Sequence, residues 1–154
     1  MSEKFATEVA TVATGTDKTA INLFHSAATP TNRGRICDLV VGGAGTPGDN
    51  SATFYVGRTT AVGTEGSGLV PNNLDSGGPA GDFDSGLGVF SGEPTYTAAK
   101  QFLRFALNHR ATFRWVAYPG FEWIMTATQN NGAGIKSSTS SSTQAYSHAI
   151  LFEE

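Results

Sequence analysis

The sequence has a single cysteine, few charged residues and no long apolar run. Cys37 has no second cysteine to pair with, so an internal disulfide is excluded. No apolar stretch approaches the roughly 18 residues that a membrane-spanning helix needs, and the N-terminal segment lacks the basic head and apolar stretch of a secretory signal. We therefore expect no membrane partner, and a chain that is made in a cytoplasm.

Charge is scarce as well. Charged residues make up 15% of the chain, compared with about a quarter in typical domains. Lys and Arg number 10 against 13 Asp and Glu, so the net charge is −3. A mildly acidic chain without a basic cluster is unsuited to a polyanion, and no nucleic-acid partner is expected. The length of 154 residues fits one domain spanning residues 1–154.

The sequence has none of the spacings that mark a catalytic or metal site. Its three histidines lie far apart, and there is no His-x-x-x-His, Cys-x-x-Cys, Gly-x-Ser-x-Gly or phosphate-binding loop pattern. We therefore expect no catalytic residue, no metal and no cofactor, and predict that the protein is not an enzyme. A hydrolase whose catalytic residues meet only in space remains a third hypothesis, behind the two binding functions described below.

A glycine-rich stretch does contain the Gly-x-Gly-x-x-Gly spacing of dinucleotide-binding turns. In those turns a helix follows the glycines, with its N-terminus facing the pyrophosphate. Here Pro47 interrupts the turn and residues 51–56 alternate like a strand. The stretch is therefore interpreted as a loop between two strands.

Period-2 alternation and β-branched residues predict an all-β, antiparallel fold. The expected strands are Glu3–Val12, Thr19–Ser26, Arg35–Val41, Ala52–Thr60, Lys100–Leu107, Ala111–Ala117, Glu122–Thr126, Gly134–Ser140 and Gln144–Glu153. The fifth and sixth are expected to form a hairpin, although residues 97–107 also tolerate a helical pattern. Cys37 shares strand parity with Leu39 and Val41, which predicts a small core residue.

Residues 61–94 form a long Gly-, Asp-, Ser- and Pro-rich excursion between strands. Long loops in compact domains are usually functional. This one carries apolar residues that a plain linker would not need. We therefore predict interface anchors at Leu69, Val70, Phe83 and Phe90.

Two other segments are candidate contacts. Tyr118 and Phe121 flank a Pro-Gly turn, and with Trp123 they suit a protein interface or a sugar platform, or else form a corner of the core. At the N-terminus, Phe5 and Val9 share one parity. Residues 1–16 are interpreted either as an arm that joins a neighbour's sheet or as a strand that closes the chain's own sandwich.

Several runs of the sequence resemble known proteins, namely 19–30, 58–66, 110–117, 130–132 and the terminal 152–154. They are similar to small structural proteins of tailed bacteriophages, above all capsid decoration (cement) proteins of jelly-roll type. The resemblance implies a jelly-roll-like β-sandwich on the virion surface, bound to the major capsid protein and associated as a homotrimer or homodimer. The alternative is a carbohydrate- or receptor-binding β-sandwich module of a phage tail or fibre.

Overall fold

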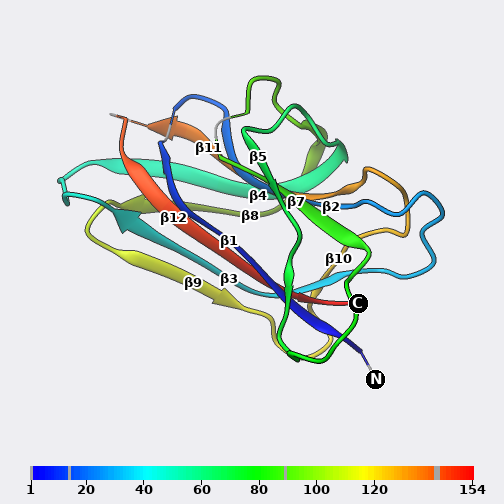
Figure 1. Ribbon diagram of the computed structural model, residues 1–154. Helices are drawn as coiled ribbons and strands as arrows, with labels where there is room; N and C mark the ends of the chain where they lie inside the picture. Colours follow the sequence, from blue (N-terminus) through cyan, green and yellow to red (C-terminus); the bar gives the residue numbers. More distant parts are fainter. Residues whose placement is uncertain (1, 14, 89, 141–142) are drawn as a thin grey trace.

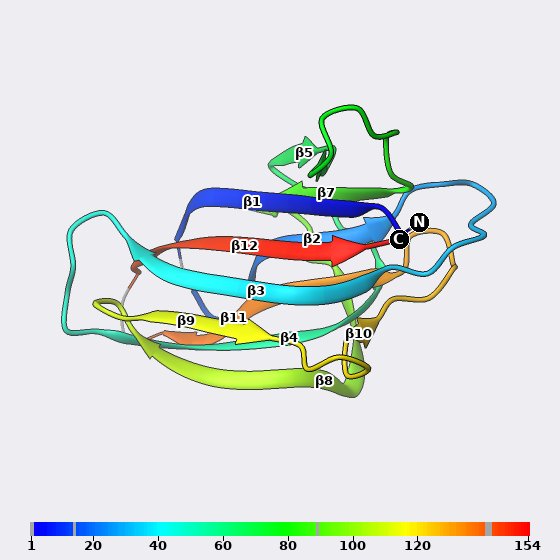
Figure 2. The ribbon, with the colours of Figure 1, turned by 90° about the horizontal axis from the view of Figure 1, so that it is seen from below.

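The computed structural model describes residues 2–13, 15–88, 90–140 and 143–154, which form strands and no helix (Figure 1). The strands are β1 (Lys4–Ala13), β2 (Lys18–His25), β3 (Arg35–Ala44), β4 (Ser51–Ala61), β5 (Ser67–Leu69), β6 (Asn72–Asn73), β7 (Phe83–Leu87), β8 (Thr95–Asn108), β9 (Thr112–Val116), β10 (Trp123–Ile124), β11 (Gly132–Ser140) and β12 (Ala145–Glu153). They make two antiparallel sheets packed face to face (Figure 2), so the predicted all-β sandwich is confirmed.

The strand order is that of a jelly roll. Sheet A has the order β10-β3-β12-β1-β6, with β9 also pairing with β3, and sheet B has the order β5-β7-β2-β11-β4-β8. Without the short strands, β9-β3-β12-β1 faces β8-β4-β11-β2. Along the chain, most steps between these eight strands cross from one sheet to the other. This order is the two-Greek-key arrangement of a jelly roll.

The core lies between the sheets and is built by strict alternation. In β12 every second residue is buried, namely Tyr146, His148, Ile150 and Phe152. The Phe54 ring of β4 meets the Tyr146 ring edge to face, with centroids 5.0 Å apart. Each large apolar side chain buried in this way contributes about 1.5–3 kcal/mol to folding.

The excursion at 61–94 is more ordered than a loop. Its strand β7 pairs with β2, β5 pairs with β7, and β6 pairs with β1, so the segment widens both sheets. Phe83 and Phe90 are buried, and the expectation that they are exposed anchors is wrong. The reason is that Phe83 shares its face of β7 with Ser85 and Leu87, which also point into the sandwich.

Strands β8 and β9 do not form the expected hairpin. β8 pairs with β4 in sheet B, whereas β9 pairs with β3 in sheet A, so residues 109–111 form a corner between the sheets. Residues 97–107 belong to strand β8 and do not form the helix that their pattern also tolerates. Apolar residues of both strands nevertheless face the same interior of the sandwich. The Phe105 and Phe113 rings stack there with centroids 3.9 Å apart.

Cys37 is not the small core residue that its parity predicts. The pairing of β12 with β3 changes register between Leu151 and Phe152, opposite Cys37. Ile36 and Leu39 on either side are both buried, while Cys37 is half-buried and lines a hollow on the outward face of sheet A. A β-bulge of this kind reverses the parity of the residues before it.

The N-terminal segment lies within the chain's own sandwich. β1 pairs with β12 over most of its length and with β6 on its other edge, as the closing-strand alternative predicts. Phe5 is buried and stacks on Phe152, with ring centroids 5.4 Å apart. Val9 is partly buried and packs against the core, so neither residue is an exposed contact.

Gly132 allows β11 to pass close to the backbone of β2, and its substitution tests this strand pairing. A Cβ at this position would meet the carbonyl oxygen of Leu23 and lie 2.7 Å from the Phe24 Cα. We expect Gly132→Ala to lower the free energy of unfolding by about 1–3 kcal/mol in urea denaturation, because rigid strands must separate. Gly77→Ala, where a Cβ has no close neighbour, should have almost no effect. Equal stabilities of the two variants would contradict the β2–β11 register.

Candidate interaction surface

The outward face of sheet A carries small, aliphatic and charged side chains side by side. The register aligns Ala6 of β1, Leu151 of β12, Asp38 of β3 and Val116 of β9 in one row across the sheet. Ala6 and Leu151 are only half-buried because they point away from the core. Where a side chain is as short as that of Ala6, the strands are accessible to another surface.

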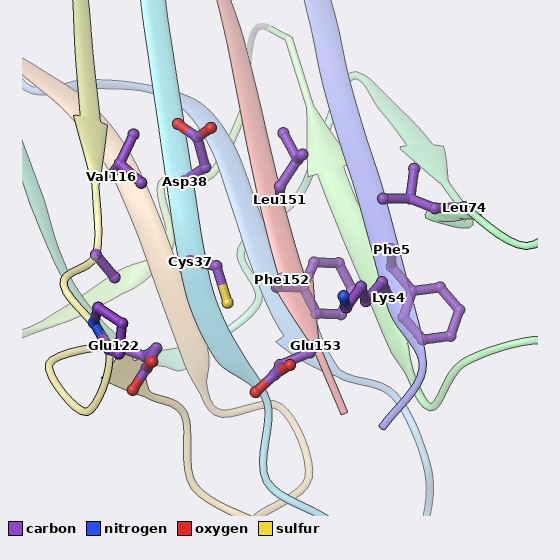
Figure 3. A pocket seen from close by; sticks show the side chains of 12 residues that line it. Lys4, Phe5, Cys37, Asp38, Leu74, Val116, Glu122, Leu151, Phe152 and Glu153 are labelled. Carbon is purple, nitrogen blue, oxygen red and sulfur yellow. The ribbon is translucent and has the colours of Figure 1, made fainter. Parts of the chain in front are cut away.

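A groove of about 350 Å³ lies on this face (Figure 3). Val116 and Glu122 stand on one side of it, Lys4 and Leu74 on the other, and Cys37, Asp38 and Leu151 lie between them. Leu74 and Val116 are 56% and 57% exposed, so each side of the groove presents one aliphatic side chain to solvent. We call this hollow the sheet A groove.

The charges in the middle of the sheet A groove are neutralised within the chain. Asp38 accepts hydrogen bonds from the Arg114 guanidinium at 3.1 Å and 3.2 Å, and this interaction raises the pKa of Arg114. Glu153 lies 3.6 Å from Arg35. Burial and then the charge of Glu153 raise the pKa of the Cys37 thiol, so it stays protonated and weakly nucleophilic.

A rigid turn beside the groove displays two aromatic rings. In the sequence Tyr118-Pro119-Gly120-Phe121, the Phe121 amide donates to the Tyr118 carbonyl at 2.8 Å, and Gly120 has φ 87°. Proline followed by a residue with positive φ defines a type II turn. Tyr118 and Phe121 are 74% and 72% exposed, with ring centroids 6.0 Å apart and planes tilted by 59°. We call these four residues the aromatic turn.

Trp123 does not join the exposed rings. It is stacked between Trp115, with centroids 3.7 Å apart, and Phe102, with centroids 5.1 Å apart. Arg58 lies over the Phe102 ring, 5.0 Å from its centroid. The stack closes the open side of the sandwich between β8 and the β9–β10 edge. Of the three predicted aromatic residues, Tyr118 and Phe121 therefore form an exposed turn, whereas Trp123 forms a corner of the core.

The two other predicted contacts, Leu69 and Val70, lie elsewhere. Val70 is 58% exposed, and with the half-buried Leu69 it lines a separate hollow of about 190 Å³ at the edge of sheet B. Glu65 faces this hollow, and burial followed by the charge of Asp84 raises the pKa of its carboxyl group. The predicted interface residues therefore do not form one continuous surface.

The histidines do not contribute to the sheet A groove. His25 and His148 are buried in the core, and His109 accepts from the Gly48 amide at 3.1 Å through Nδ1. Its Nε2 therefore donates to the Ala145 carbonyl oxygen, 2.8 Å away. The His109 ring thus links the loop at Gly48 to the start of β12. Among the described residues, no group of three His, Cys, Asp or Glu side chains is placed to hold a metal ion. Nor does this part of the chain contain a helix long and apolar enough to cross a membrane.

Comparison with known proteins finds no family model, no curated protein and no solved structure that matches the chain. The class is therefore defined by the structure itself: a jelly-roll-like β-sandwich with an apolar groove and an exposed aromatic turn on one sheet. Sequence reasoning did not select Lys4, Leu74, Val116 or Glu122 for this site. Val116 had a usable signal, because it shares its strand face with the polar Arg114.

Proposed function

We propose that the protein is a structural component of a bacteriophage virion that binds the outside of the capsid. There it would stabilise the shell by bridging neighbouring capsid subunits, without enzymatic activity. The supporting observation is the aromatic turn, where Tyr118 and Phe121 are largely exposed on a backbone held by its own hydrogen bonds. Aromatic side chains that cost little entropy to hold are typical anchors of protein interfaces. The sequence resemblance to decoration proteins supplies the identity of the partner, the major capsid protein.

The architecture suits a mechanical role. Most backbone pairing in the sandwich joins segments far apart in the chain, such as β1 with β12, and Glu122 Oε1 accepts from the Gly120 amide at 3.0 Å to brace the turn. A contact of modest strength, repeated over many symmetric positions on a shell, gives strong overall attachment. A rigid module with a pre-formed anchor avoids the entropy cost of ordering each copy.

The carbohydrate-binding alternative has less support in the geometry. A sugar platform needs open ring faces, but Trp115 and Phe102 cover both faces of Trp123. The remaining rings, Tyr118 and Phe121, are inclined to each other by 59°. They fit a pocketed protein surface better than a flat sugar ring.

Removal of the aromatic turn's rings tests the proposal. We expect the purified chain to saturate matching undecorated phage heads at a fixed ratio in a co-sedimentation assay. The double variant Tyr118→Ser/Phe121→Ser should bind at least about tenfold more weakly, because two buried anchors are lost. Its thermal unfolding should be unchanged, because neither ring is part of the core.

The matched control is Val70→Ser, which removes another mostly exposed apolar side chain, next to β5 of the other sheet, and should bind heads like the unmodified chain. Undiminished binding by the double variant would contradict the assigned anchor. Retention of the unmodified chain on a glycan surface, together with no binding to heads, would favour the receptor-binding alternative.

A further inference from the structure

The two sides of the sheet A groove are complementary to each other. Leu74, which follows β6, and Lys4 of β1 form one side, while Val116 at the end of β9 and Glu122 form the other (Figure 3). Each side thus offers one exposed aliphatic residue and one charged residue, and the two charges have opposite signs.

Neither of these two charges has an ion-pair partner in the described part of the chain, although the Glu122 carboxylate also accepts a hydrogen bond from the Gly120 amide. The Lys4 ammonium group makes no ion pair in the part of the chain that the structure describes. Hydrogen bonds from its own amide and from the Gly120 amide lower the pKa of Glu122, so its carboxylate is ionised at neutral pH. Asp38 and Glu153, in contrast, already have Arg114 and Arg35 as partners. The unpaired charges therefore stand at the rims of the groove.

A two-fold axis along the middle of the sheet A groove exchanges its two sides. It places Leu74 against Val116 of the second copy, and Lys4 against Glu122 of the second copy. Leu151, between the rims, then meets its own counterpart. A self-complementary patch of this kind is what a two-fold interface requires, since each contact occurs twice.

The face also allows two sheets to approach closely. Ala6 and Ala149 point outward next to Leu151, so the face is low there, while the charged Glu8 and Arg114 stand on the same face. Stacked sheets pack about 10 Å apart. We propose that the sheet A groove is the interface of a two-fold homodimer in which sheet A of one copy packs against sheet A of another. The proposal depends on the groove alone and not on the proposed capsid role.

Charge reversal tests the dimer directly. The molar mass of the purified full chain is measured by sedimentation over a range of concentrations at low salt, for the unmodified chain and for Lys4→Glu, Glu122→Lys and the double variant. We expect a dimer for the unmodified chain, and at least a tenfold rise in the dimer dissociation constant for each single reversal. The double variant should recover affinity to within a few-fold, because the exchanged charges attract again.

Two further variants complete the design. Leu74→Asp should abolish the dimer and leave the unfolding temperature unchanged, because its side chain is mostly exposed. Lys100→Glu, an exposed reversal on β8 of the opposite sheet, should leave the dimer intact. A monomer or a trimer for the unmodified chain would overturn the proposal, as would single reversals without effect or a double variant weaker than either. All these readings are made without phage heads, so they stand or fall separately from capsid binding.

Discussion

Replacing Phe83 by alanine is expected to lower the free energy of unfolding by about 3–5 kcal/mol. The ring is fully buried between the sheets and packs against the His25 ring, with centroids 4.4 Å apart, and the Phe152 ring, with centroids 5.6 Å apart. Alanine would leave a cavity that rigid paired strands on both sides cannot close. Urea denaturation monitored by tryptophan fluorescence measures the loss.

Val70→Ala is the matched control, because Val70 belongs to the same excursion but is mostly exposed. Its substitution should change the unfolding free energy by less than about 0.5 kcal/mol. A small effect of Phe83→Ala, close to that of Val70→Ala, would mean that β7 is not docked on β2. In that event Phe83 would again be a candidate surface anchor.

Acidification is expected to destabilise the fold through His148. Burial lowers the pKa of His148 from 6.5 to about 3, so the imidazole is neutral in the folded protein. Below pH 6.5 the unfolded chain takes up a proton that the folded chain excludes. The free energy of unfolding is therefore unaffected by the protonation of His148 above about pH 6.5, and it declines as the pH falls from 6.5 towards 3. Between pH 7 and pH 4 this amounts to about 3 kcal/mol.

His148→Leu isolates this contribution, because leucine fills a similar volume and does not titrate. Its unfolding free energy should vary less between pH 7 and pH 4 than that of the unmodified chain, by about the same 3 kcal/mol. Glu65 and Glu154 act in the opposite sense, since burial raises the pKa of each and protonation then favours the fold. Because the unmodified chain and His148→Leu both contain these two glutamates, their contributions cancel when the two pH profiles are compared. Parallel pH profiles would show that His148 is accessible to protons in the folded state.

The two proposed contact surfaces, the aromatic turn and the sheet A groove, differ in how far the sequence alone could identify them. Tyr118 and Phe121 were identifiable from the Pro-Gly turn, whose φ requirement is a local property. Lys4, Leu74, Val116 and Glu122 come from three distant parts of the chain and meet only because β6, β1, β12, β3 and β9 lie side by side. No motif spacing marks such a set, because its members share no segment.

The sequence by itself determined that the chain is all-β and where most strands lie. Alternation with period 2 is a local property, and β12 shows it without interruption. Only the tertiary structure decided which sheet each strand joins, that the excursion supplies β7 and buries Phe83, and that a bulge turns Cys37 outward. Sheet membership and register follow from contacts between distant residues, where packing outweighs local preference. The exposed groove is a product of those contacts, and its chemistry could be recognised only once the strands of sheet A were in place.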